Sequence, residues 1–198
     1  MKFPSIRQTV EQSPTIQDLI ECVEILTGRR RNREIDYGTI DGVRTKVLDI
    51  VHMCNMGRIK AKAYRNAAQN IDAGPSSPTK VLIDTISRDT EGVVDTTNSR
   101  IIPTLPGDYV VMGNVMASAV PDGQRVNAVI FKNDEPVSYG TIDNQGATGP
   151  SSSSASDLIY MNGTTDYLEL YAYNSHSAAL TLYTGYSYQN YISILGPF

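Results

Sequence analysis

The two histidines of the chain, His52 and His176, are the first candidates for catalytic chemistry. His52 lies two residues before Cys54, and an imidazole beside a thiol can activate it as a nucleophile. Residues two positions apart on a helix point in different directions, however, which separates these two groups. His176 lies in the polar turn Asn-Ser-His-Ser, where a solvated loop residue is expected. We therefore predict that the chain has no catalytic residues and is not an enzyme.

Acidic turns are the next candidates, because carboxylates are the usual calcium ligands. Asp89-Thr-Glu91 and Asp143 lack the spacing of a calcium loop, so ordinary turn chemistry is the better interpretation. Asn162-Gly-Thr164 matches a glycosylation acceptor, but we expect it to serve as a turn. The sequence contains no phosphate-cradling glycine loop and no Cys/His spacing typical of a metal site. The prediction is that the protein needs neither a metal nor another cofactor.

Composition narrows the class of protein. The 198 residues suit one domain with an extra segment or two small domains, and 40% apolar content allows a packed core. A net charge of -4 and a pI near 5.1 argue against nucleic-acid binding. No apolar run reaches the length of a membrane span, so no membrane insertion is expected. The first residues show no apolar secretion signal, which predicts synthesis in a cytoplasm and, for an external protein, release by lysis.

Cysteine and tyrosine usage adds two further indications. Cys22 and Cys54 cannot form a disulfide framework and are interpreted as buried thiols in a reducing compartment. The chain has twelve Tyr against three Phe and no Trp. Tyrosine gives rigid contact area with a hydroxyl, so this bias could indicate a contact surface. The alternative is that tyrosine simply suits β-strands, and composition leaves both interpretations open.

The N-terminal part is predicted to be largely helical. Ser13 is a good N-cap, Pro14 suits the first helical position, and Gly28 ends the helix. An arginine run follows, which we interpret as a solvated loop, with an acidic partner or nucleic acid as the alternative. The apolar stripe of this helix is Ile16, Leu19, Ile20, Val23 and Leu26, and the run begins with Arg29 and Arg30.

A second amphipathic segment spans residues 43–54, as a core helix or about two heptads of coiled coil. Residues 58–71 fit a helix and, at Ile59–Ala63, also a strand; the alanine content favours the helix. The stretch Ala73-Gly-Pro-Ser-Ser-Pro78 is then interpreted as a linker. The predicted organisation is therefore a helical segment over residues 1–75 and a β-domain over residues 76–198.

Gly107 to Asn133 organises the second part. Two β-rich runs flank Pro121-Asp-Gly123, which predicts a hairpin. In the first run Tyr109, Val111 and Val115 share one face. The opposite face carries Val110 and Met112, so this strand is expected to be buried on both sides.

Further short strands are predicted at residues 81–83, 101–105, 136–139, 157–161, 178–183 and 191–195, with a loop over 140–154. Residues 166–173 alternate, with Leu168, Leu170 and Ala172 inward and tyrosines outward. Many short strands separated by turns indicate an antiparallel sandwich or jelly roll.

The order of these features resembles a known fold. Gly107-Asp-Tyr109 opens a long strand, Arg125 to Asn133 follows, and Asp166-Tyr-Leu-Glu-Leu-Tyr171 precedes the closing Ser187 to Leu195. Together they are similar to the globular head of complement component one q and the related tumour-necrosis-factor jelly roll. The resemblance implies a tight homotrimer. It places the strand over residues 166–173 and the closing strand near the threefold contact. The predicted interface residues are Tyr109, Tyr167, Tyr171, Tyr173 and Tyr191.

The chain lacks a collagen-like stalk, and its jelly roll resembles knobs on bacteriophage fibres and head decorations. Ser13 to Arg30 is similar to segments that root such fibres. The resemblance implies a virion protein that docks on capsid or tail proteins through residues 1–75. The anchor would be formed by the stripe and arginines named above, and the knob would bind a host glycan or protein or stabilise the shell. The alternative is a soluble tumour-necrosis-factor-like or lectin-like binding module; an enzyme is a distant third.

Overall fold

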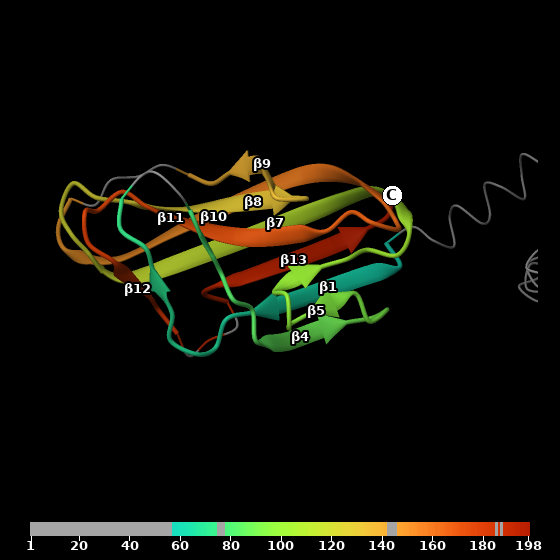
Figure 1. The fold of residues 1–198 in the computed structure, drawn as a ribbon, viewed down its shortest axis with the longest axis horizontal. Coiled ribbons are helices and arrows are strands. Elements are labelled where there is room, and N and C mark those ends of the chain that lie inside the picture. Colours follow the sequence, from blue (N-terminus) through green and yellow to red (C-terminus); the bar gives the residue numbers. More distant parts are fainter. Residues whose placement is uncertain (1–56, 75–77, 142–145, 185, 187) are drawn as a thin grey trace, which may run out of the picture. The chain divides into compact units, whose positions relative to one another are not determined.

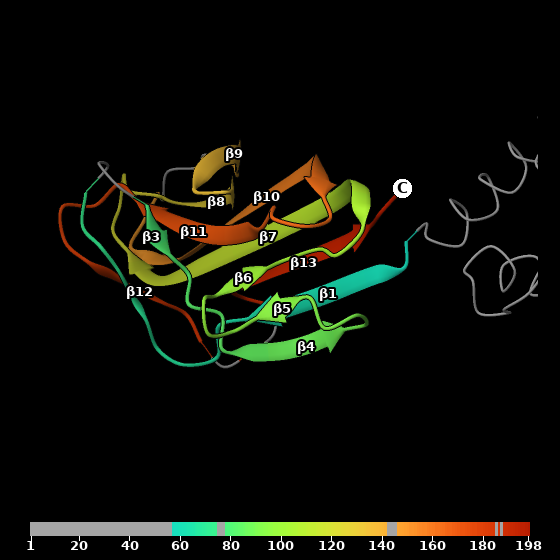
Figure 2. The same ribbon diagram turned by 45° about the vertical axis from the view of Figure 1, so that its right-hand side comes forward.

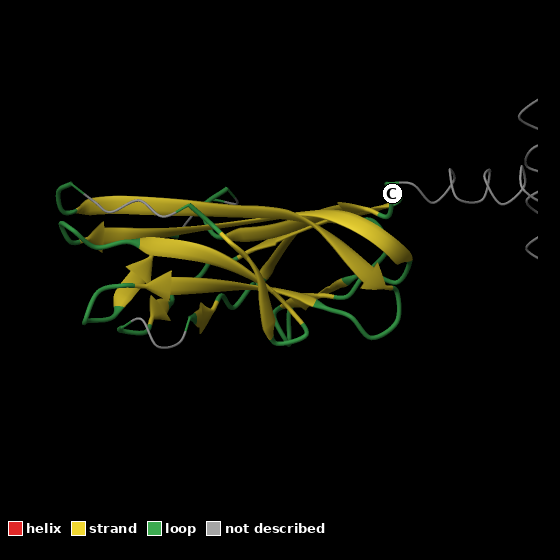
Figure 3. Cartoon of the chain, turned by 90° about the horizontal axis from the view of Figure 1, so that it is seen from above, coloured by secondary structure: helices red, strands yellow, loops and turns green. Residues whose placement is uncertain are grey.

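The computed structural model describes residues 57–198, except 75–77, 142–145, 185 and 187. The predicted anchor residues (Ile16, Leu19, Ile20, Val23, Leu26, Arg29 and Arg30), the segment 43–54, the His52–Cys54 pair and Asp143 lie outside these residues. Asn55–Phe198 forms one compact unit. Its described residues are strands, turns and loops, and they contain no helix (Figure 3).

Two antiparallel sheets form a sandwich, as predicted (Figures 1 and 2). Sheet A runs in the order β2 (Asn70–Ile71), β12 (Leu180–Leu182), β7 (Pro106–Val120), β13 (Tyr191–Gly196), β1 (Ile59–Tyr64) and β4 (Thr85–Asp89). β10 (Gly149–Asn162) pairs along the other edge of β7. Sheet B runs in the order β5 (Val94–Asp95), β6 (Arg100–Ile101), β11 (Leu168–Asn174), β8 (Val126–Lys132) and β9 (Glu135–Tyr139), and β3 (Thr79–Lys80) pairs with β11.

The core lies between the two sheets, and strands such as β1, β7, β10 and β11 contribute alternate residues to it. Tyr109, Val111 and Val115 of β7 are fully buried, and the predicted inward residues of β11 are buried opposite them. The two layers lie close together at Gly113, because a Cβ there would lie 2.8 Å from Leu170 Cδ1 of the other sheet. The alternation predicted for residues 166–173 is thereby confirmed.

The helix predicted over residues 58–71 is wrong. β1 lies inside sheet A, between β13 and β4, with Ile59, Ala61 and Ala63 buried and Lys60 and Lys62 on the outer face. Partners on both edges override the intrinsic preference of alanine for helices. The sandwich therefore begins before the predicted boundary at residue 75, and the stretch 73–78 connects β2 to β3 within it.

The predicted hairpin is also wrong, although its turn forms. Gly123 has a φ of 73° and the Gln124 amide donates to the Pro121 carbonyl, but β7 belongs to sheet A and β8 to sheet B. Each strand has a face that is buried in the core, and placing the two strands in opposite layers lets these faces pack against each other. The Asp-Gly signal specifies a turn and not the pairing of the strands that it joins.

The loop predicted over residues 140–154 is shorter than expected, because β10 starts at Gly149. Ser151 and Ser153 point inward and are buried, and the Ser153 hydroxyl donates to the Thr141 carbonyl at 3.0 Å. A run of serines that looks like loop sequence can form a strand when a long partner such as β7 satisfies its backbone.

Candidate self-association surface

β7 carries apolar residues on both of its faces, but the described part of the chain covers only one of them. The inner residues from Tyr109 to Ala117 are buried. On the outer face Val110 is 39% exposed and Met112 is 46% exposed. Among residues 57–198 as described, the expectation that this strand is buried on both sides is therefore wrong, and its outer face presents apolar side chains that a partner could cover.

The neighbouring strands extend this apolar surface. The sheet register places Val110 between Leu158 of β10 and Leu195 of β13, and Met112 lies in the next outward-facing row. Leu158 is 60% exposed and Leu195 is 39% exposed. Tyr160, two positions along β10, adds a ring that is 57% exposed. We call this surface the apolar face of sheet A: Val110, Met112, Leu158, Tyr160 and Leu195.

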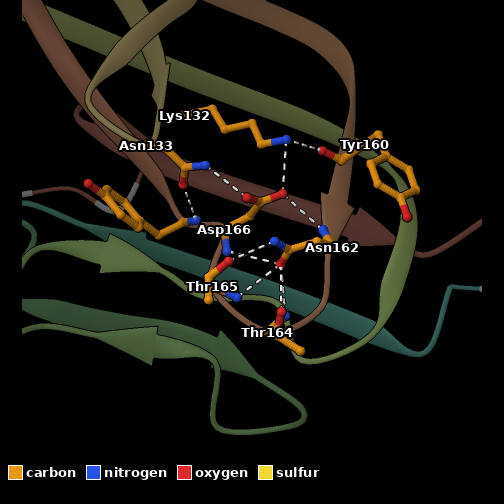
Figure 4. A network of polar contacts seen from close by, with 8 residues as sticks. Lys132, Asn133, Tyr160, Asn162, Thr164, Thr165 and Asp166 are labelled. Atoms are coloured by element: carbon orange, nitrogen blue, oxygen red, sulfur yellow. Dashed lines mark hydrogen bonds and ion pairs between the residues drawn. The ribbon is translucent and has the colours of Figure 1, made fainter.

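One end of β10 is held by a polar turn (Figure 4). The Asn162 side-chain oxygen accepts hydrogen bonds from the backbone amides of Thr164, Thr165 and Asp166, at 2.9 to 3.1 Å. Gly163 takes a φ of 74° in this turn, and a Cβ there would lie 2.5 Å from the Pro106 nitrogen. The Asn-Gly pair was predicted as a turn, and the structure confirms it.

Asp166 connects this turn to the end of β8. Its carboxylate pairs with the Lys132 ammonium at 2.9 Å and accepts a hydrogen bond from the side-chain amide of Asn133 at 2.8 Å. The same ammonium donates to the Tyr160 carbonyl at 2.8 Å. Burial opposes ionisation of Asp166, but the hydrogen bonds from Asn133, Lys132 and the Asn162 amide lower its pKa below the usual value. The network fixes the backbone that presents Tyr160.

A second polar cluster bounds the other end of the apolar face. The Asn114 oxygen accepts from the Ser154 hydroxyl at 2.7 Å, and its amide donates to the Gln189 carbonyl. Asn190, which is fully buried, accepts from the Met116 amide at 2.8 Å. The side-chain oxygen of Gln189 is buried and has no hydrogen-bond partner among the residues that the structure describes. The outer face of sheet A thus changes from apolar to polar along β7.

The predicted interface tyrosines do not share one surface. Tyr191 lies on the outer face of sheet A, whereas Tyr167, Tyr171 and Tyr173 lie on the outer side of sheet B. Tyr109 must be removed from the set, because it is fully buried in the core. Its hydroxyl donates to the Leu105 carbonyl at 2.9 Å, and burial raises its pKa to about 12.

The tyrosines of sheet B already have partners within the chain. The Tyr171 ring packs on Phe131 with a centroid distance of 4.0 Å, and burial together with the Glu169 carboxylate raises its pKa to about 12. The Arg100 guanidinium lies 5.0 Å from the Tyr167 ring, and Arg125 lies 5.8 Å from the Tyr173 ring. Their role in a trimer contact stays a prediction, and most of the exposed aliphatic residues on the strands lie on the other sheet.

The acidic and histidine candidates that fall within the described residues are engaged in turns. Asp89 accepts from the amides of Val93 and Val94, and Glu91 pairs with Arg58 at 3.1 Å, so both acids serve the turn. The His176 amide donates to the Asn174 side chain. Among the described residues, no group of three or more His, Cys, Asp or Glu is placed to hold a metal ion.

None of the described segments is a helix long and apolar enough to cross a membrane.

Comparisons with known proteins show the fold. No family model and no curated protein matches the sequence. The structure is similar to that of murine APRIL, a tumour-necrosis-factor-like protein, with a TM-score of 0.50 at 9% identity over 69% of this chain and 97% of that one. The globular domain of zebrafish complement 1qA aligns with a TM-score of 0.46 at 8% identity, over 71% of this chain and 98% of that one. The described part of the chain therefore has a tumour-necrosis-factor-like jelly-roll fold.

Proposed function

We propose that the protein is a homotrimeric jelly-roll knob that works by binding and not by catalysis. The observation that carries the proposal is the apolar face of sheet A, on strands whose sequence is patterned for burial on both sides. Complete burial of a large apolar side chain is worth about 1.5–3 kcal/mol, so covering several of them gives association a clear driving force. The likeness to tumour-necrosis-factor-like folds supports three copies as the stoichiometry.

We further propose that the trimer is a structural protein of a bacteriophage particle, as a head fibre, decoration or tail knob. The support comes from the sequence: the acidic composition and the resemblance of Ser13 to Arg30 to segments that root fibres on a virion. In this proposal the N-terminal residues dock on capsid or tail proteins, and the knob binds a host surface or stabilises the shell.

The alternative is a soluble tumour-necrosis-factor-like or lectin-like binding module. The fold supports this alternative, and so does a pair of exposed, stacked rings, Tyr186 and Tyr188, whose centroids are 5.1 Å apart. Such rings offer rigid contact area at low entropic cost. In this alternative a Tyr186→Ala/Tyr188→Ala variant should lose binding to a glycan array while remaining trimeric.

Two measurements test the proposal. Light scattering of the purified chain should give three times the chain mass, and a monomer at all concentrations would contradict the trimer. A variant lacking residues 1–54 should remain trimeric but no longer attach to phage particles that lack the protein. The cut must precede Asn55, because a cut at residue 75 would delete β1 from the middle of sheet A. Attachment by the shortened chain would contradict the anchor assignment.

A further inference from the structure

The outer face of sheet A has a positively charged edge. Lys60 and Lys62 of β1 lie next to Leu195 and Ser193 of β13, and Arg88 of β4 lies opposite Lys62. None of the three cations pairs with a carboxylate among the described residues, and the Lys62 ammonium lies 4.0 Å from the Tyr191 ring centroid. The nearby acids Asp89 and Glu91 are engaged by the turn and by Arg58. Like charges directly opposite on neighbouring strands repel, so this edge is left electrostatically unsatisfied.

The opposite edge of the sandwich, where β10 of sheet A lies beside β9 of sheet B, is acidic. Asp157 of β10 lies on this edge, opposite Val111 in the register, so it belongs to the side of β10 that faces sheet B and not to the apolar face. Asp134 and Glu135 lie at the turn between β8 and β9, and Lys132, paired with Glu135 in the strand register, reaches the Tyr160 carbonyl of β10. Among the described residues these three carboxylates have no cation partner, since the Lys132 ammonium is paired with Asp166. All three acids are exposed.

We infer that the partner that covers the apolar face is a second copy of this chain, docked so that its acidic β10 edge meets the cationic β1–β4 edge of the first. The inference rests on the self-association proposed above and specifies which edges meet. The apolar face lies between the two charged edges, across β10, β7 and β13. A contact between unlike edges uses two different patches of each copy, and repeating it closes a ring when the rotation allows.

Apolar and charged side chains would contribute differently to this contact. Burial of Val110, Met112, Leu158 and Leu195 supplies the affinity. The charges at the rim fix which edge faces which and disfavour a contact that joins like edges. Rim charges remain partly hydrated, so their effect must weaken as salt screens it.

Charge reversal in the full-length chain tests the inference. One variant carries Lys62→Glu and Arg88→Glu, a second carries Glu135→Lys and Asp157→Lys, and a third carries all four changes. Asp122→Lys, in the exposed turn after β7, is the control for a change of net charge at a distance. The concentration at which each trimer dissociates is measured by sedimentation at about 50 mM and about 500 mM salt. Thermal midpoints verify that each variant is folded.

Each double variant should raise the dissociation concentration by about threefold to tenfold at low salt, and the fourfold variant should return it toward the parent value. Asp122→Lys should have little effect, and the differences should shrink at high salt. A fourfold variant no better than either double variant, or double variants that match the parent, would overturn the inference while leaving the trimer intact. A parent chain that stays monomeric would overturn the proposed function itself.

Discussion

Leu158 of β10 lies directly opposite Val110 of β7, and both side chains are exposed on the outer face of sheet A. Cross-strand apolar pairs of this kind usually stabilise a sheet by packing on each other beneath further structure. Here the inner residues of the same strands already form the core, so the outer pair has no cover within the described chain. The pair marks the centre of the surface at which we expect copies of the chain to meet.

Leu158→Glu should convert the trimer to monomer at concentrations where the parent chain is trimeric. The change places a carboxylate at the centre of an apolar contact, where burying an unpaired charge costs more than the leucine contributed. The matched control is Leu82→Glu, which alters another exposed leucine that lies outside the apolar face. Native mass spectrometry should find a monomer for Leu158→Glu and a trimer for Leu82→Glu. The same oligomeric state for both variants would show that the apolar face is not the contact.

Much of the fold is predictable because the alternation of apolar residues along a strand indicates which of its faces lies in the core. The parity of residues 107–117 placed Tyr109 on the same side as Val111 and Val115, and all three are buried. The same alternation argues against Tyr109 as an interface residue, because a side chain that packs in the core cannot contact a partner chain. The alternation of β11 was predictable for the same reason.

Pairing and surface were not predictable in this way. Ala61 and Ala63 favour helix locally, and only β13 and β4, distant in sequence, make them part of a sheet. The exposed face of β7 resembles core in the sequence, because burial by a second chain and burial within one chain select the same apolar residues. The resemblance placed Tyr167, Tyr171 and Tyr173 at the predicted contact, and these lie on the side of sheet B. The exposed aliphatic residues Val110, Met112, Leu158 and Leu195 lie instead on sheet A.

Asn162→Ala should destabilise the knob by about 1–3 kcal/mol, because three backbone amides lose their acceptor. The matched control is Thr164→Ala, which removes only a 3.2 Å contact from the Thr164 hydroxyl to the same Asn162 oxygen. Urea unfolding at one fixed protein concentration measures both, since association makes the midpoint depend on concentration. A larger loss for Thr164→Ala than for Asn162→Ala would contradict this account of the turn.

Gly113→Ala should cost about 1–3 kcal/mol of stability through overpacking between the layers. The new Cβ would lie 2.8 Å from Leu170 Cδ1 and 3.5 Å from Ile130 Cγ1, both in the opposite sheet. Gly146→Ala is the control, because a Cβ at that position meets nothing within 4 Å. Thermal unfolding should give a clearly lower midpoint for Gly113→Ala than for Gly146→Ala. Equal midpoints would mean that the layers can move apart at Gly113 at no cost.

Stability should fall as the pH drops below about 4, the usual range of an unfolded aspartate. Burial opposes ionisation of Asp84 and Asp166, but hydrogen bonds and nearby cations lower the pKa of each below its usual value. A lowered folded pKa means that the contribution to stability is present above the unfolded pKa and is lost as the pH falls through the folded one. Urea unfolding at pH 7, 5 and 3 should therefore show little change between the first two and a marked loss at the third. Asp166→Asn should be less stable than the parent chain at pH 7, and the difference should narrow at pH 3, because the contribution of the Asp166 charge to stability decreases once the pH is below the unfolded pKa. A constant difference between the two chains at all three pH values would show that the Asp166 charge, paired with Lys132, does not contribute to the stability of the fold.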